Sequence, residues 1–436
     1  MTPPRTDGLA IHGGPSSVWV PLPRPWPFFD DEASQRVLEL LDAGEVSDYD
    51  HGEVLSAFES TVRAYQGVRY ALACASGTDA LFAALFGLGV GPGDEVVVPT
   101  YSFHATVAPL FLLSAVPVLC DVDPLQGNID VADAEARITE RTRAIVYTHM
   151  WGTVADVDAL QRVAAEHSLA LVEDCSHAHG ATVDERRVGN FSDAAIFSLG
   201  ARKMVSGGMG GVLVTSREDV FAGALRLGHT HERAREMWPA DDVAVGLGMN
   251  SRISLISAAL CQQQYASLDD RIDVKRTVLE GLSARLTASS HLLEPPPPPP
   301  TGTTRGAWYG YKARFSGNPA QLDYYIAALN AEGVPVARPS NRPLHTLPMF
   351  ESDRLLPAYY RSGVPWRTYA SQELPGSLEY YARAVSFPAV HLHRPADNLL
   401  DQWASATSKV DSALASVLDS SDKQGKRSDD SPATPR

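Results

Sequence analysis

The sequence has few cysteines and no long hydrophobic run. Its four cysteines, Cys74, Cys120, Cys175 and Cys261, are far apart and show neither a CxxC motif nor metal-ligand spacing. This pattern argues against a zinc site and a disulfide framework, and it indicates a reducing compartment. The longest apolar runs, such as residues 107–113, are far shorter than the roughly 20 residues of a membrane-spanning helix. We therefore expect a cytoplasmic protein that does not enter a membrane.

Residues 1–14 lack the apolar core of a signal peptide, because proline, glycine and polar residues interrupt them.

Positively charged residues are also scarce. The 436 residues include 37 lysines and arginines against 52 aspartates and glutamates, a formal net charge of −15. Without an arginine-rich cluster, this balance argues against binding to nucleic acid. The hydrophobic share of 44% and the charged share of 20% are typical of a globular chain.

Two segments differ in composition from the rest of the chain. Residues 419–436 contain no aromatic and no branched aliphatic residue, so we expect a disordered tail. Six prolines at 295–300 restrict the backbone, either as a ligand for a proline-binding module or, more simply, as a stiff connection within one fold. The predicted organisation is an N-terminal arm (1–21), a large domain (22–270), and a smaller C-terminal domain (271–418) that contains this polyproline linker.

Between residues 70 and 215, short apolar runs alternate with helical patterns. Such alternation predicts an α/β domain with a mainly parallel sheet, in which ligands bind beyond the C-terminal ends of the strands. A long helical pattern at 254–286 then leads to a smaller α/β domain with elements near 308–315, 321–329 and 399–417. The predicted strands of the large domain are 95–98, 117–122, 144–148, 170–173, 194–197 and 211–214, and its predicted helices include 77–88, 106–113 and 157–167.

Ser76, Gly77 and Thr78 lie at a predicted junction between a strand and a helix, in the run ASGTDAL. Backbone N–H groups and the positive end of the helix dipole make such a junction suitable for binding a phosphate. The alternative is a plain N-cap without a ligand.

Glu173 and Asp174 end a predicted buried strand, where a carboxylate is unfavourable unless it has a partner. We expect Asp174 to face a cation or strong hydrogen-bond donors; a solvated strand end or an N-cap is the alternative. His177 and His179 follow closely. No further ligand comes at a suitable spacing, so we expect no metal there.

Lys203 lies just past a predicted strand and before a glycine cluster. Burial and the like charge of Arg202 would both lower the pKa of its amine, a property of lysines that form Schiff bases. An ordinary exposed loop lysine is the alternative. Together, a phosphate site, a carboxylate for a pyridinium nitrogen and a reactive lysine are what pyridoxal 5'-phosphate (PLP) requires.

The chain resembles the DegT/StrS family of PLP-dependent sugar aminotransferases, which belongs to fold type I (aspartate aminotransferase-like). The likeness covers about residues 22–417. It implies a large domain with a mainly parallel seven-stranded sheet, a smaller C-terminal α/β domain and a homodimer with shared active sites. The motifs that carry it are ASGTDAL, GDEVVVPTYSFHAT, PVLCDVD with NID, HMWG, EDCSHAHG, FSLGARK with a following GG, and GMNSRIS with AAL.

The resemblance also implies roles for particular residues. Lys203 matches the Schiff-base lysine, and Asp174 matches the partner of the ring nitrogen. The cofactor phosphate would be held by Ser76, Gly77, Thr78 and Ser198, and by Asn250 from the neighbouring subunit. Phe103 would stack on the pyridine ring and His177 would lie near its phenolic oxygen. A core position for Phe103 and a simple turn at Asn250 are the alternatives.

Two segments depart from the family pattern. Met209 stands where a glutamate is usual, and Gly200-Ala201-Arg202 also differs from the common run. The resemblance implies transfer of an amino group from glutamate or glutamine to a keto sugar or a ketocyclitol. We slightly prefer the keto sugar as acceptor, in nucleotide-linked form. His345 and Arg342 are candidate substrate contacts, with a surface position as the alternative for His345. A dehydratase or C–C lyase on the same scaffold and a non-catalytic PLP-binding regulator remain rival interpretations.

Overall fold

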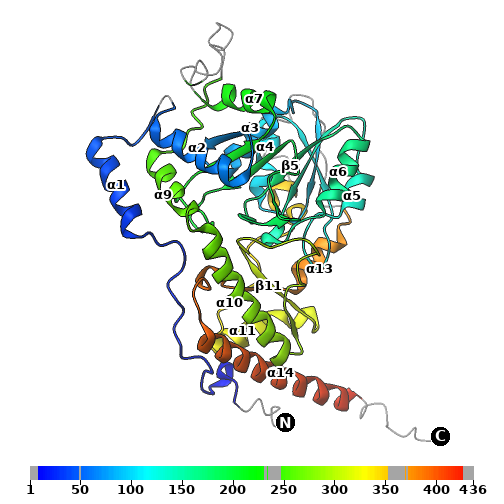
Figure 1. Cartoon of the computed structure of the whole chain (residues 1–436). Helices are drawn as coiled ribbons and strands as arrows, with labels where there is room; N and C mark the ends of the chain where they lie inside the picture. Colours follow the sequence, from blue (N-terminus) through cyan, green and yellow to red (C-terminus); the bar gives the residue numbers. More distant parts are fainter. Residues whose placement is uncertain are drawn as a thin grey trace, which may run out of the picture.

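The computed structural model describes residues 8–48, 51–229, 233, 247–351, 369 and 372–425. Figure 1 shows a large domain built around a sheet and a smaller domain below it, connected by the long helix α10 (Leu268–Ser289). The described parts of both chain ends lie beside the smaller domain. The predicted domain boundary at residue 270 falls within α10, so a continuous helix passes from one domain to the other.

The large domain contains a seven-stranded sheet in the order β1-β9-β8-β5-β4-β2-β3. Strand β9 runs antiparallel to both of its neighbours, and the other pairs are parallel. The predicted mainly parallel seven-stranded sheet is therefore confirmed. The strands are β1 (Tyr70–Cys74), β2 (Glu95–Pro99), β3 (Val116–Cys120), β4 (Thr142–Thr148), β5 (Ala170–Asp174), β8 (Ala194–Ser198) and β9 (Gly211–Thr215).

Helices cover both faces of this sheet, because successive strand residues point to opposite sides. Val96 and Val98 pack with α3, α4 and α7, whereas Val97 packs on the other face with α2, α6 and α9. The helices of the large domain are α1 (Asp31–Ala43), α2 (Glu53–Gln66), α3 (Gly77–Gly87), α4 (Ala108–Leu112), α5 (Val131–Ala136), α6 (Val157–Glu166), α7 (Glu218–Gly228) and α9 (Leu255–Tyr265).

The smaller domain packs a three-stranded antiparallel sheet against helices, with its own core around Trp403 and Tyr311. A two-stranded hairpin of the large domain, β6 (Thr182–Val183) with β7 (Arg186–Arg187), bridges to Thr303 after the proline run. The elements of the smaller domain are β10 (Leu293–Glu294), β11 (Tyr311–Phe315), β12 (Ala384–Phe387), α11 (Leu322–Ala331) and α14 (Asp397–Gly425). The short helix α12 (Pro348–Glu351) packs instead on the large domain, and α13 (Pro375–Arg383) contacts both domains.

Several predicted boundaries differ from the structure. The pattern at 254–286 forms two helices, α9 and α10, that are separated at residues 266–267. The helix predicted at 106–113 is reduced to α4, preceded by a single 3₁₀ turn. Helix α14 extends to Gly425 and so overlaps the first residues of the predicted tail, whereas residues 426–436 lie outside the described residues.

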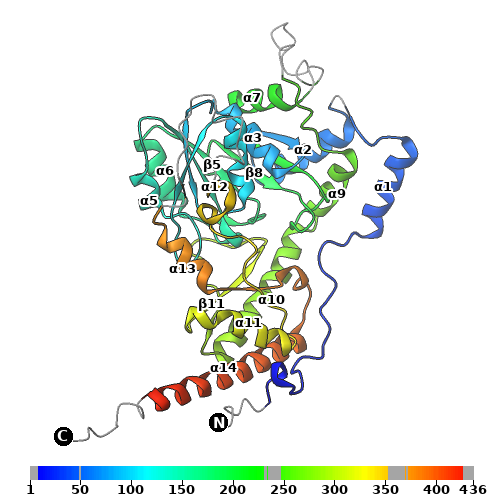
Figure 2. The same ribbon diagram turned by 180° about the vertical axis from the view of Figure 1, so that it is seen from behind.

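The N-terminal arm is packed against the smaller domain rather than standing apart from it. Leu9 is buried in that domain's core, and Glu332 accepts hydrogen bonds from Ala10 N and Ser17 Oγ. The chain then runs along the molecule to α1, beside the large domain (Figure 2). Trp26 lies on this path, and its indole Nε1 donates a 2.7 Å hydrogen bond to the carbonyl of Lys203.

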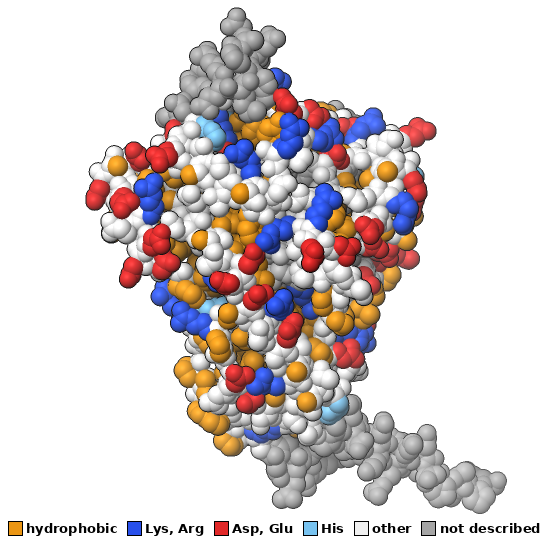
Figure 3. Space-filling model, in the orientation of Figure 1, with side chains coloured by type: hydrophobic (Ala, Val, Ile, Leu, Met, Phe, Trp, Pro, Cys, Tyr) orange, Lys and Arg blue, Asp and Glu red, His pale blue; other side chains and the backbone are white. Residues whose placement is uncertain are grey.

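Acidic and basic side chains are interspersed on the face shown in Figure 3. None of the helices in the described ranges combines the length and the apolar character that a membrane crossing requires.

Candidate active site

A cavity of about 310 Å³ lies at the C-terminal edge of the parallel strands. The first turn of α3, the end of β5, the end of β8 and the loop after β8 all reach it, because parallel strands end at the same edge of a sheet. Among the predicted site residues, the structure brings into its wall Ser76, Gly77, Thr78, Phe103, Asp174, His177, Ser198 and Lys203.

The start of α3 comes very close to the end of β8. A Cβ atom on Gly77 would lie 2.8 Å from Ser198 Cβ, so any side chain larger than hydrogen would force the two segments apart. Ser76 is the N-cap of α3, and its Oγ accepts a 3.1 Å hydrogen bond from Asp79 N. Since the first turn of α3 lines the cavity, the positive end of the helix dipole faces it. The arrangement suits an anion held close to the backbone.

Asp174 is only 7% exposed and has neutral hydrogen-bond donors as its direct partners. Thr106 Oγ1 donates to one carboxylate oxygen at 3.2 Å, and Ser176 N donates to the other at 3.0 Å. Its charge also acts on the amine of Lys203. The carboxylate of Asp174 therefore has two neutral donors as partners, and its low exposure argues against the alternative of a solvated strand end.

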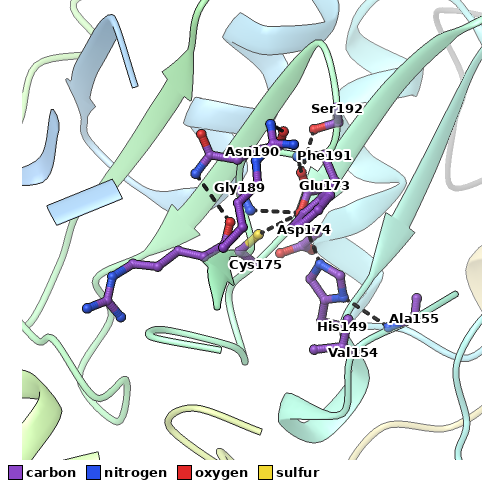
Figure 4. Close-up of polar contacts among 12 residues, drawn as sticks. His149, Val154, Ala155, Glu173, Asp174, Cys175, Gly189, Asn190, Phe191 and Ser192 are labelled. Carbon is purple, nitrogen blue, oxygen red and sulfur yellow. Dashed lines mark hydrogen bonds and ion pairs between the residues drawn. The ribbon is translucent and has the colours of Figure 1, made fainter. Parts of the chain in front are cut away.

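Glu173 points to the opposite side of β5 and is completely buried within a polar network (Figure 4). Since Ala155 N donates to His149 Nδ1 at 3.1 Å, the proton of this ring is on Nε2, which donates to Glu173 at 3.1 Å. Burial would raise the pKa of Glu173, but these hydrogen bonds hold it below its ordinary value. The further donors to its carboxylate are Gly189 N, Phe191 N, Ser192 Oγ and Cys175 Sγ.

This network holds three possible metal ligands, His149, Glu173 and Cys175, within 4.8 Å of one another. Both oxygens of Glu173 already accept several hydrogen bonds, and burial keeps the pKa of Cys175 well above its usual value. The cluster is therefore satisfied as a structural anchor for the strand that carries Asp174.

Lys203 is partly buried, with its Nζ 4.1 Å from the centre of the Tyr309 ring. Burial lowers the pKa of Lys203 to about 8, and the carboxylate of Asp174 opposes this shift. The predicted contribution of Arg202 is wrong, because the charge of Arg202 acts on Tyr309 instead. A lysine with this pKa is partly neutral near neutral pH, as a nucleophile or base requires.

His177 lies in a group of three parallel rings. Its ring is 5.2 Å from that of Trp151 and 4.2 Å from that of Tyr309, with both planes within 8° of its own. Burial and the nearby charge of Lys203 keep the pKa of His177 well below its ordinary value, so the ring is neutral. The sequence analysis did not identify Tyr309, which lies in the segment before β11 and outside every motif. Trp151 belongs to the HMWG motif, but no role was assigned to it.

Other lining residues come from loops. Phe103 is 49% exposed over the cavity, so its alternative as a core aromatic is wrong. Met209 is 68% exposed in the wall and occupies the position where the family pattern has a glutamate. Ser340 and Asn341 also line the cavity. No sequence signal distinguished them, because they belong to an irregular loop between two domains.

Three predicted residues do not line this cavity. Asn250 is exposed with a φ of 58°, and its Oδ1 accepts a 2.8 Å hydrogen bond from Arg252. Arg342 is exposed next to Asn341. His345 is buried behind the wall, where its Nδ1 lies 2.8 Å from Thr100 Oγ1. The predicted direct substrate contact of His345 thus lacks support, and its alternative as a surface residue is wrong.

Comparisons with known proteins agree with this geometry. Residues 28–395 match the model of the DegT/DnrJ/EryC1/StrS aminotransferase family. The chain therefore belongs to this family, has the fold of the fold type I PLP-dependent enzymes and is an aminotransferase.

Two curated relatives and one solved structure illustrate the likeness. L-glutamine:scyllo-inosose aminotransferase from Streptomyces griseus is 34% identical over 93% of this chain and 97% of its own length. GDP-perosamine synthase from Caulobacter vibrioides is 33% identical over 74% of this chain and 85% of its own. The crystal structure of 3-amino-5-hydroxybenzoic acid synthase superposes with a TM-score of 0.76 at 27% identity, over 91% of this chain and 100% of its own.

Proposed function

We propose that the cavity binds PLP and that the protein transfers an amino group from glutamine or glutamate to the ketone of a keto sugar or ketocyclitol. One observation carries the proposal: the start of α3, Asp174 and Lys203 line the same cavity. The donor set fits this cofactor. The first turn of α3 and Ser198 line one side of the cavity, where a helix N-terminus can hold a phosphate, and Asp174 offers a buried acceptor to a ring N–H.

When bound, PLP supplies an electron sink for the negative charge that develops at the donor Cα. Asp174, supported by Thr106 and Ser176, would accept a hydrogen bond from the ring nitrogen and so favour the protonated form of that nitrogen. Phe103 would cover the cofactor ring with an apolar face. Trp151 N donates to Nδ1 of neutral His177 at 3.4 Å, so the proton of this imidazole is on Nε2, which would donate to the phenolic oxygen of the cofactor. Lys203, with its lowered pKa, attaches the cofactor and then moves the proton from the donor Cα.

A substitution of Lys203 tests this assignment. Lys203→Ala should lower turnover by roughly a thousandfold or more, because nucleophile and base are lost together. Borohydride reduction followed by peptide mass spectrometry should find PLP attached to the Lys203 peptide of the wild type only. Full turnover by the variant would overturn the mechanism. Stoichiometric release of the donor's keto acid separates transamination from a dehydratase, a C–C lyase or a regulator without catalysis.

For the acceptor, we place a ketocyclitol before a nucleotide-linked keto sugar. The relative that matches over almost the whole chain is named for scyllo-inosose, whereas the GDP-perosamine relative matches over a smaller share. This order reverses the slight preference drawn from the sequence. Steady-state amination with glutamine of scyllo-inosose, dTDP-keto sugars and UDP-keto sugars decides between them, and exclusive turnover of a nucleotide-linked sugar would restore the earlier order.

We further propose a cytoplasmic homodimer in which Asn250 contacts the phosphate bound by the neighbouring subunit. The exposed position of Asn250, outside its own chain's cavity, is compatible with this role. The cytoplasmic location is supported by the four cysteines, which are all buried and unpaired. Lys203→Ala and Asn250→Ala subunits, combined as verified heterodimers, should recover activity, because both lesions then fall on one of two sites. Heterodimers that recover no activity would count against an active site shared between two subunits.

A further inference from the structure

A second cavity, of about 190 Å³, adjoins the first on the other side of the aromatic rings. It lies between the domains, and Trp151, Tyr309 and Ser340 belong to the walls of both cavities. Its remaining wall comes from the segment before α1, the loop after β8, α10, β11 with the residues before it, β12 and the segment after β12. This second cavity is not required to explain the placement of PLP.

The second cavity is lined by cations without a matching carboxylate. Lys275, Lys312 and Arg202 face it together with His393, and no aspartate or glutamate is found in its wall among the described residues. Lys275 is 7% exposed, and burial lowers its pKa to about 8. Burial likewise lowers the pKa of Lys312 to about 7. A buried ammonium without an anionic partner is unfavourable, so the arrangement favours an anion from outside.

Lys312 is held in place by its neighbours. Its Nζ donates a 2.6 Å hydrogen bond to Ser386 Oγ, directly across the sheet, and lies 4.0 Å from the centre of the Trp151 ring. A Cβ on Gly310 would lie 2.6 Å from Trp151 Cε3 and 3.2 Å from Lys312 Nζ, so only glycine permits this close packing. Lys275 lacks such a partner among the described residues, which leaves its ammonium available to a ligand.

The aromatic wall between the two cavities lies between the Lys312 ammonium and the Lys203 amine. The Tyr309 ring, with Lys203 Nζ on it, and the Trp151 ring, with Lys312 Nζ on it, are parallel within 2° at 6.3 Å between their centres. The two cavities therefore adjoin at these rings, and a group that enters the second cavity from the first must belong to a substrate's side chain rather than to its reacting carbon. The volume suits one small group, since sites that enclose a whole drug-sized ligand have about 300–1,000 Å³.

We propose that the second cavity is an oxyanion subsite in which Lys275 and Lys312 bind the side-chain carboxylate of glutamate as amino donor. Glutamine has no side-chain carboxylate and would place its neutral amide there. This inference rests on the proposed function and assigns it a specificity determinant for the donor. The carboxylate pairs with two ammonium groups, and Arg202 adds a positive field at the mouth.

Replacing each lysine by an uncharged side chain of similar length tests the subsite. In Lys275→Met and Lys312→Met holoenzymes, the apparent dissociation constant of glutamate, from single-turnover changes in cofactor absorbance, should rise about tenfold or more, whereas that of glutamine should change much less. The KM of the acceptor should stay unchanged. Arg276→Met is the matched control, because Arg276 is next to Lys275 on α10 and pairs with Asp273. It should behave as wild type.

A second measurement does not depend on catalysis. In apoprotein, 2-oxoglutarate should raise the unfolding temperature of the wild type and of Arg276→Met, and the shift should be smaller in both lysine variants. Unchanged glutamate affinity in Lys275→Met would overturn the subsite, as would a higher KM for a nucleotide-linked acceptor alone. If no amino acid reacts with any variant, the proposed function fails, and the unfolding temperatures still decide whether the cavity binds a carboxylate.

Discussion

The two cavities share a wall of aromatic rings but differ in how their charges are balanced. In the first, Lys203 faces Asp174, a carboxylate of the same chain. In the second, Lys275 and Lys312 line the cavity, and no carboxylate of the described chain lines it with them. Burial lowers the pKa of a lysine in both places, to about 8 at Lys203 and about 7 at Lys312.

This difference indicates different uses of a buried amine. The first cavity needs an amine that is partly neutral and a carboxylate that stays charged, so both charges are supplied by the protein. The second leaves its cations unpaired, which costs stability in the free protein and favours a ligand that brings a negative charge. Removing the carboxylate from the first cavity and adding one to the second would test this interpretation.

The largest effect is expected where the first cavity loses its carboxylate. Asp174→Asn should slow the half-reaction with the donor by about 10²- to 10⁴-fold, because the ring nitrogen loses its charged partner. The carboxylate raises the pKa of Lys203, so its removal should also lower the pKa seen in the pH–rate profile below about 8. Stopped-flow measurements of cofactor absorbance across pH give both quantities. A pKa that rises in the variant would contradict the assigned pairing.

A large loss of stability is expected where the first cavity loses its support. Glu173→Gln removes the charge to which five groups from three segments donate, and it should lower the free energy of unfolding by roughly 1.5–3 kcal/mol at neutral pH. The folded-state pKa of Glu173 is depressed, so its contribution is present above the unfolded pKa and is lost as pH falls through the folded value. Urea unfolding at several pH values should therefore show a difference from wild type that shrinks in acid. A constant difference would contradict this origin.

Much of the first cavity was predictable because its residues lie in short local patterns. Buried apolar runs located six of the seven strands, and ligand sites in such sheets lie at the strand ends, where Asp174 and Ser198 are found. Strand β1 was expected only as the strand before the ASGTDAL junction, without bounds, because its run YALAC is short and rich in alanine. The break between α9 and α10 was missed because Ala266 and Ser267 do not interrupt the apolar pattern.

The second cavity was not predictable, because no local pattern contains it. Lys275 lies in a polar stretch of a long helix and Lys312 in an alternating strand, and both patterns are typical of solvent-facing residues. Only the packing of four distant segments buries them together. His345 was misplaced for the same reason, since its contact with Thr100 joins residues 245 positions apart.

An intermediate effect is expected from filling the close approach on which the first cavity depends. The new methyl group in Gly77→Ala would lie 2.8 Å from Ser198 Cβ, and overpacking of this kind costs about 1–3 kcal/mol. The affinity for PLP, measured by equilibrium dialysis, should fall tenfold or more. Gly91→Ala is a matched control, because no atom lies within 4 Å of the Cβ that it adds. Equal cofactor affinity in both variants would show that the approach is not required.

The smallest effect is expected from giving the second cavity a carboxylate of its own. Ser386 accepts the hydrogen bond of Lys312 Nζ at 2.6 Å, so Ser386→Asp places a negative charge against this ammonium. The new carboxylate should raise the pKa of Lys312 and compete with the side-chain carboxylate of glutamate, which weakens binding of this donor by about tenfold in single-turnover titrations. Ser386→Asn keeps the size and polarity without the charge and should bind the donor more nearly as wild type does. If Ser386→Asp binds the donor as tightly as wild type, the unpaired charge of this cavity has no role in binding.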